Sequence, residues 1–285
     1  MPKVIAGVGR RRTPESSKFI FTIDTTKPGS PNNMFFLNAN DLGTYNATIE
    51  WGDGTTSKVD SFNSLGLRHT YDTPGIYTVK IYGSLPWVKF SGDDKLKLIS
   101  INQWGNIQWL NMATTFKDCS NLEIYATDIP NTSSVTSMGE TFWGCTSLTN
   151  VDFSGWDLSS VIYFSSTFNS CTSLQSVDFT NTILNTSSNV LTMSYTFYNC
   201  GEFDLIGFDT LDLTKVSTYE GFLNSSKIPT NRYDSLLIHL NSLNMTSGLS
   251  ISFGTSQYTS GSLAEAAKSN LITNDLWAIT DGGGI

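Results

Sequence analysis

The octapeptide "TFWGCTSL" at residues 141–148 decides the fold, because relatives of it recur along the chain. The relatives are "TFKDCSNL" (115–122), "TFNSCTSL" (167–174) and "TFYNC" (196–200). Alignment on their phenylalanine gives spacings of 26, 26, 29 and 25 residues, in the column Phe116, Phe142, Phe168, Phe197 and Phe222. Such a period indicates an array of short coils, in which each coil completes its core only by packing on its neighbours.

One strand is expected in each repeat, directly after the cysteine turn. The predicted strands are 96–104, 122–127, 148–156, 174–180 and 203–210. A period of 20–29 residues with one strand and one turn predicts a leucine-rich-repeat solenoid with a parallel sheet over residues 85–228. Successive coils should then lie roughly 4.8 Å apart, which is the strand spacing of a sheet.

The four cysteines occupy one column of the repeat: Cys119, Cys145, Cys171 and Cys200, followed by Ser225 in the fifth copy. A zinc site needs four sulfurs that converge on one point, which a line of stacked residues does not supply. Neighbouring Cα atoms in such a line are within disulfide range, but their parallel side chains do not face each other. We therefore predict a ladder of buried, unpaired thiols and keep a disulfide as the alternative.

The best copy, "MGETFWGCTSLTNVDFSGW" (138–156), resembles the BspA-like leucine-rich repeat. Repeats of this type occur in bacterial, mycoplasma and protozoan surface proteins and in phage structural proteins. The resemblance covers roughly residues 96–228. The fourth copy departs from the pattern through extra residues in "NTSSN" (185–189), where we expect a loop to bulge from the array.

The segment before the repeats, residues 19–84, is predicted to be a small antiparallel β-sandwich. Its short β-branched and aromatic runs are separated by turn signals, at 19–24, 34–39, 46–51, 56–60 and 76–83. Here "WGDGTTSKV" (51–59) and "HTYDTPGIYTVKI" (69–81) resemble the PKD domain, an immunoglobulin-like sandwich. The resemblance implies a spacer or an adhesive module.

Residues 229–285 are predicted to be a small α/β capping unit. Helices are expected at 233–243 and 262–272 and strands at 248–253 and 277–280, with Ser262 and Glu265 as a capping box. An array of coils needs such a unit to cover its open end. The order of these elements is similar to a closing unit that follows such repeats in phage tail and Bacteroides-type proteins.

Charge is distributed unevenly along the chain, whose net charge is −8. Residues 1–18 form a basic tail, with Arg10, Arg11 and Arg12 as the candidate anchor, whereas the remaining body is acidic. An acidic body argues against a nucleic-acid partner, because the phosphates repel it. No run approaches the length of a membrane span, and "MPKVIAGVGRRR" does not have the order of a secretory signal.

No motif of an enzyme, a cofactor site or a metal site occurs in the sequence, and we expect none of the three. A turn aspartate and a half-buried strand histidine explain Asp53 and His69 better than a catalytic or calcium role does. A glycosidase-like carboxylate pair is the alternative interpretation of Asp152, Asp178 and Asp209. Solvated residues at one position of the repeat are the preferred interpretation of these three.

Exposed aromatic residues are the best candidates for a contact surface. Trp143 stands beside the cysteine column where other copies have Lys117, Asn169 or Tyr198, and such variability indicates an outward position. The candidate contact residues are Trp143, Tyr198 and Trp109, whereas Trp104 and Trp156 are expected in the core.

These observations predict a non-enzymatic surface protein of a bacteriophage virion, in a head or tail fibre or as a decoration. Both resembled modules work outside cells, and a phage, which leaves by lysis, needs no export signal. The tail would dock to other virion proteins, and the solenoid would contact a host surface protein or glycan. A homo-oligomer stays open. The alternatives are a bacterial cell-surface or secreted adhesin and a carbohydrate-binding accessory module.

Overall fold

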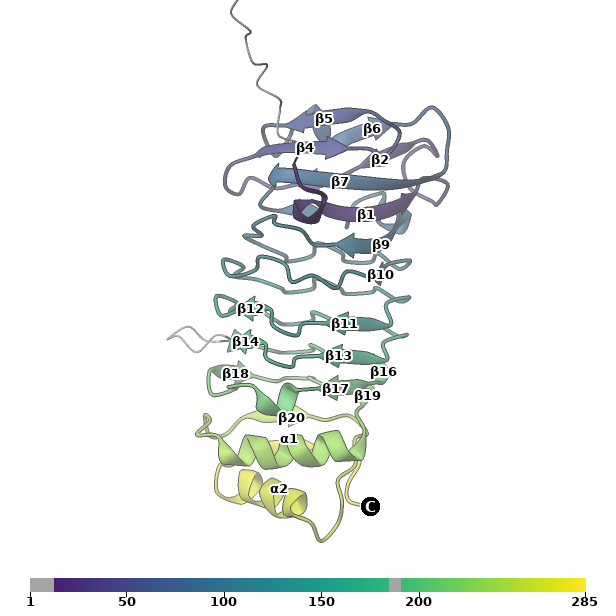
Figure 1. Ribbon diagram of the computed structural model, residues 1–285. Coiled ribbons are helices and arrows are strands. Elements are labelled where there is room, and N and C mark those ends of the chain that lie inside the picture. The colour runs from purple at the N-terminus through teal and green to yellow at the C-terminus, as the bar shows by residue number, and fades with distance from the viewer. Residues whose placement is uncertain (1–12, 185–190) are drawn as a thin grey trace, which may run out of the picture.

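The computed structural model describes residues 13–184 and 191–285, which form a column of stacked elements (Figure 1). These residues are mainly β, as expected, and the two α-helices among them lie together at the end of the column that contains the C-terminus. The candidate anchor, Arg10, Arg11 and Arg12, and the expected loop at 185–189 lie outside the described residues.

The N-terminal unit is built from short antiparallel strands and two 3-10 turns. Its elements are η1 (Glu15–Ser17), β1 (Phe19–Asp24), β2 (Met34–Phe36), β3 (Asn38–Ala39), β4 (Asn46–Glu50), β5 (Thr56–Val59), η2 (Leu65–Leu67), β6 (Arg68–Thr70), β7 (Ile76–Ser84) and β8 (Val88–Lys89). Strand β1 buries every second side chain, which is the period of a strand with one buried face. One strand was expected at 34–39, but β2 pairs with β6 and β3 pairs with β8, because the chain changes partner at Leu37.

The repeats follow as short, mostly parallel strands. Their elements are η3 (Lys95–Lys97), β9 (Leu98–Gln103), β10 (Glu123–Ile124), β11 (Asn150–Asp152), β12 (Asp157–Leu158), β13 (Ser176–Asp178), β14 (Ile183–Leu184), β15 (Leu191–Thr192), β16 (Gly201–Glu202), β17 (Asp204–Ile206), η4 (Phe208–Thr210), β18 (Val216–Thr218) and β19 (Ser226–Lys227). Strands β11, β13 and β17 lie above one another in register, and β12 and β14 pair in a second column (Figure 1).

Most of these strands are much shorter than the expected ranges, because a turn ends them early. Asp152 Oδ1 accepts a hydrogen bond from the backbone N–H of Ser154 at 2.7 Å, and Asp178 Oδ1 accepts the same bond from Thr180 at 2.7 Å. An aspartate that bonds the backbone two residues ahead favours a turn over a continued strand. The recurring aspartates therefore shape the coils.

Strand β9 connects the N-terminal unit to the repeats. It pairs antiparallel with β1 and parallel with β10, so that both parts of the chain share one six-stranded sheet, in the order β10-β9-β1-β7-β4-β5. The buried apolar residues form one contiguous cluster from Phe19 to Trp277.

A buried ion pair reinforces this connection. Lys97 Nζ and Asp94 Oδ1 are 3.0 Å apart, and both side chains are almost fully buried. Lys97 Nζ also donates to the backbone oxygens of Ser30 and Met34, each at 2.8 Å. A buried charge is tolerated only when paired and hydrogen-bonded, so this pair ties the loop before β2 to the first coil.

The C-terminal unit contains α1 (Thr230–Ser242), β20 (Ser250–Ser252), α2 (Leu263–Thr273) and β21 (Ala278–Thr280). Ser262 Oγ accepts hydrogen bonds from the N–H groups of Ala264 and Glu265 and so caps α2. Strand β20 pairs parallel with β21, and an isolated bridge joins Ile251 of β20 to Tyr219. The parallel stacking therefore continues past the last expected repeat. No helix in the described ranges is long and apolar enough to cross a membrane.

Candidate contact surface

A stack of phenylalanines runs through the core and sets the position of every neighbouring column. Successive ring centroids lie 5.3–5.4 Å apart, with interplanar angles from 4° to 21°, along Phe90, Phe116, Phe142, Phe168 and Phe197. The alignment missed Phe90, although it lies 26 residues before Phe116. Since these rings face inward, the residue after most of them is partly exposed, as at Lys117, Trp143 and Tyr198, whereas Asn169 after Phe168 is buried.

The cysteines form a second column beside this stack, where all four are buried and free. Each of three thiols donates to the carbonyl oxygen of a phenylalanine in the preceding coil, at 3.0 Å: Cys145 to Phe116, Cys171 to Phe142 and Cys200 to Phe168. Burial raises the pKa of all four thiols, that of Cys200 to about 12. Such thiols are poor nucleophiles, which fits a packing role.

The fifth member of this column is Ser226, and the assignment to Ser225 was wrong. Ser226 Oγ donates to the carbonyl oxygen of Phe197 at 2.6 Å, which is the bond that the thiols make in the earlier coils. The fifth copy is shifted by one residue relative to the alignment, because the N–H of Phe197 donates to the carbonyl oxygen of Phe222, which therefore takes the threonine position of the repeat. Leu223 then takes the phenylalanine position, and Ser225, with a φ of 59°, matches the positive-φ residue before each cysteine.

A third column, of threonine hydroxyls, was not foreseen. Thr141 Oγ1 lies 2.6 Å from the carbonyl oxygen of Met138 and 2.9 Å from that of Met112, and Thr167 and Thr196 repeat the arrangement. All three hydroxyl-bearing residues are fully buried. The threonine before each phenylalanine of the repeat was the available signal.

The surface over these columns carries a group of aromatic and charged side chains, which we call the ridge. It consists of Lys117, Glu140, Trp143, Tyr195, Tyr198 and Glu220. Lys117 Nζ lies 4.2 Å from the centroid of the half-buried Trp143 ring and 2.6 Å from Glu140 Oε2. The lysine therefore makes a cation–π contact and an ion pair between adjacent coils.

The other end of the ridge is made of two tyrosines. The rings of Tyr195 and Tyr198 pack edge to face at 6.0 Å, and Tyr195 donates its hydroxyl to Glu220 Oε1 at 2.7 Å. This bond to a carboxylate raises the pKa of Tyr195. Trp143 and Tyr198 belong to the same column two coils apart, which is roughly 10 Å at the strand spacing.

Trp109 does not belong to a contact surface, so this prediction was wrong. Its side chain is 0% exposed and packs edge to face on Phe19 at 5.4 Å and on Trp104 at 6.4 Å. The cause is the packing of β1 directly onto the first coil, which covers the tryptophans of that region. Trp104 and Trp156 are also buried, as expected.

Asp53 and His69 form a local contact in the N-terminal unit. Asp53 Oδ1 accepts from the N–H of Thr55 at 2.9 Å, and Asp53 Oδ2 lies 2.7 Å from His69 Nε2, whose ring stacks on Trp51. Burial alone would raise the pKa of Asp53, but the hydrogen bonds from Thr55 and His69 lower it to about 2. Within the described ranges, no three His, Cys, Asp or Glu side chains are placed to hold a metal ion.

The three recurring aspartates do not form one set. Asp152 and Asp178 are register neighbours on β11 and β13, but the next position of that column is Ile206. Asp209 lies in η4 instead. The three were predicted to share one position of the repeat, but the altered strand of the fourth copy, "FDLIGF" (203–208), brings Ile206 to that position.

The fold and the ridge together define a mainly β protein of stacked repeats with a polar and aromatic outer face. A family model described as a Mycoplasma protein of unknown function, DUF285, matches residues 90–234, about half of the chain, and the chain belongs to this family. No curated protein and no solved structure matches the chain.

Proposed function

We propose that this chain is a non-enzymatic attachment protein that acts through the ridge on its repeat array. The ridge carries this proposal, because it combines a tryptophan, two tyrosines and charged side chains on a rigid stack of coils. Tryptophan and tyrosine are enriched among the residues that dominate binding energies. A rigid array also presents such residues with little loss of conformational entropy on binding.

The architecture that we propose has three parts. The N-terminal unit is a PKD-like sandwich, the repeats are a BspA-like leucine-rich-repeat solenoid, and the C-terminal unit is its cap. Parallel pairing of β11, β13 and β17 supports the solenoid, as do the phenylalanine and thiol columns. The motif after Trp51 and the pairing of β1, β4 and β7 support the sandwich.

We place this attachment protein on the surface of a bacteriophage virion. The basic N-terminal tail, with Arg10, Arg11 and Arg12, would dock to other virion proteins, and the ridge would contact a protein or glycan of the host surface. A second setting is the surface of a bacterial cell. The description of the family as a Mycoplasma protein favours this second setting.

Two measurements test the proposal. Immunogold labelling with an antibody against the chain should decorate either the purified phage particles or the intact cells of its source. The double variant Trp143→Ala, Tyr198→Ala should lose binding to host cells, whereas Tyr125→Ala, which removes a tyrosine that is 66% exposed outside the ridge, should keep it. Labelling of neither surface, or equal binding by the double variant and the wild type, would refute the proposal.

A further inference from the structure

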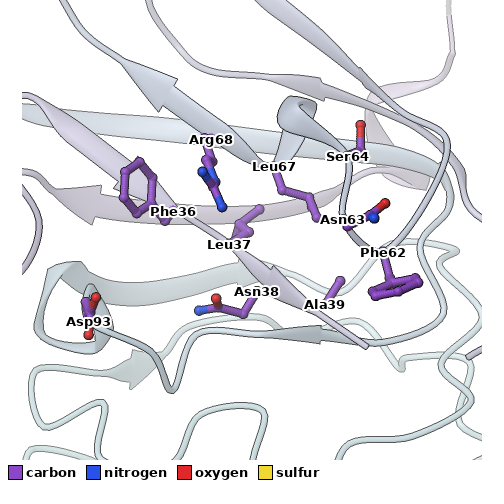
Figure 2. Close-up of a pocket in the computed structure, with 10 residues that line it drawn as sticks. All are labelled: Phe36, Leu37, Asn38, Ala39, Phe62, Asn63, Ser64, Leu67, Arg68 and Asp93. Atoms are coloured by element: carbon purple, nitrogen blue, oxygen red, sulfur yellow. The ribbon is translucent and has the colours of Figure 1, made fainter. Parts of the chain in front are cut away.

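A pocket of about 500 Å³ opens on the N-terminal unit, and its lining shares no residue with the ridge. Figure 2 shows its position between the strand segment 36–39 and the segment 62–68, with Asp93 below Arg68 in the view. Its volume lies within the range of small-molecule sites, roughly 300–1,000 Å³.

The pocket combines an apolar floor with an exposed aromatic ring. Leu37 and Leu67 are each 3% exposed, and the N–H of Leu37 donates to the carbonyl oxygen of Leu67 at 2.9 Å, so that the floor is fixed. Phe62 is 39% exposed on the loop before η2. Its ring offers an apolar face to anything that enters from solvent.

Polar groups with free hydrogen-bonding capacity surround this floor. The side chains of Arg68, Asp93 and Asn38 make no hydrogen bond or ion pair with any residue that the structure describes. The Arg68 guanidinium lies over the Phe36 ring, 5.5 Å from its centroid. Asn63 accepts from Ser61 through Oδ1 at 3.0 Å, which leaves its amide N–H groups free.

The walls of the pocket are preformed. Asp94, next to Asp93, accepts a hydrogen bond from the N–H of Phe36 at 2.8 Å and pairs with Lys97 at 3.0 Å. This buried pair therefore joins the two sides that carry Asp93 and Phe36. A preformed site loses less entropy on binding than one that must be ordered by its ligand.

We infer that this pocket binds a neutral saccharide. Arg68 and Asp93 offer one positive and one negative charge. An anionic ligand would be repelled by Asp93 and a cationic ligand by Arg68. A sugar hydroxyl both donates and accepts, which matches a guanidinium, a carboxylate and two amides in one small space. The C–H face of a pyranose ring would pack on Phe62.

The experiment is a glycan array of neutral, sialylated and sulfated oligosaccharides, probed with the full chain and its variants. Phe62→Ala removes the ring, and Gly92→Ala moves Asn38, because a Cβ at Gly92 would come 2.2 Å from Asn38 Nδ2, the end of a flexible side chain. Leu65→Ala is the matched control, since Leu65 is 79% exposed beside the pocket but outside its lining. Trp143→Ala reports on the ridge.

The inference expects binding to neutral glycans, at least about tenfold weaker for Phe62→Ala and Gly92→Ala and unchanged for Leu65→Ala and Trp143→Ala. Competition by the free sugar should abolish the signal. Binding only to charged glycans, binding lost in Trp143→Ala instead of Phe62→Ala, or no binding at all would each overturn the inference. None of these results decides whether the ridge attaches to cells, which the variant at Trp143 and Tyr198 tests separately.

Discussion

At the scale of single residues, adjacent aromatic side chains have opposite roles. Phe142 is fully buried in a stack of rings, whereas Trp143 is half-buried under Lys117. We expect Phe142→Ala to lower the free energy of unfolding by about 3–5 kcal/mol, since it opens a cavity in the stack. Trp143→Ala should lower it by about 1 kcal/mol, the order of a cation–π contact. Urea denaturation followed by circular dichroism measures both, and equal losses would contradict the assignment of inner and outer faces.

The carboxylate of Asp53 makes a separate prediction about pH. Its pKa is lowered to about 2 in the folded protein from the ordinary value of 3.8. A carboxylate whose pKa is lowered by folding stabilises the folded state at pH values above its ordinary pKa. This contribution is lost as the pH falls through 4 toward 2, because the carboxylate becomes protonated. Asp53→Asn should therefore lower the free energy of unfolding at pH 7 by about 2 kcal/mol.

The measurement for Asp53 is urea denaturation of wild type and variant at several pH values between 7 and 2. The difference in free energy of unfolding between the two proteins should disappear as the pH approaches 2, because the wild type then loses the charge that the variant lacks. Asparagine keeps the oxygen that accepts from Thr55, so the turn itself serves as the internal control. A gap that stays constant with pH would show that the charge of Asp53 does not stabilise the fold.

At the scale of the elements, the thiol column explains why cysteine recurs. Ser226 makes the same bond to the preceding coil as the thiols do, so a hydroxyl is accepted at this position. We expect Cys171→Ser to lower the free energy of unfolding by about 1 kcal/mol or less. Cys171→Ala should lower it by about 2 kcal/mol, since the buried sulfur is lost and the Phe142 oxygen keeps only the N–H of Cys145 as a donor. Thermal denaturation of both variants decides this, and a less stable serine variant would refute the role of the donor.

The elements also show how far sequence patterns reach. The spacing of "TF..C" predicted the parallel columns, and both helices of the tail were expected within three residues of their observed starts. The strand lengths were not predictable from the apolar pattern, because Asp152 and Asp178 end β11 and β13 with side-chain bonds to the next turn. Of the candidate contact residues, Trp143 and Tyr198 lie on the ridge, whereas Trp109 is covered by β1, a packing that no local pattern encodes.

At the scale of the whole molecule, the N-terminal unit and the repeats share one core. Strand β9 belongs to both, and the phenylalanine stack begins at Phe90, before the first repeat. Neither part can lose its structure without exposing the apolar side chains of the other, such as Phe19 and Trp104. The buried pair of Asp94 and Lys97 adds a second coupling at the same place.

This coupling predicts a single unfolding transition for the N-terminal unit and the adjacent repeats. Trp51 lies in the first part and Trp156 in the second, among seven tryptophans in the chain. The signal of each is therefore obtained as a difference, by subtracting the fluorescence of Trp51→Phe or of Trp156→Phe from that of the wild type. Both fluorescence curves should have the same midpoint in urea, within the error of the extrapolation. Separate midpoints would show that the two parts unfold independently and that the shared strand contributes little to stability.

Lys97→Met supplies the sharpest form of the test, because the loss of one partner of a buried pair lowers the free energy of unfolding by about 3–5 kcal/mol. If β9 couples the parts, this change at their junction should shift both curves together, and a shift of only one would show that the coupling is absent.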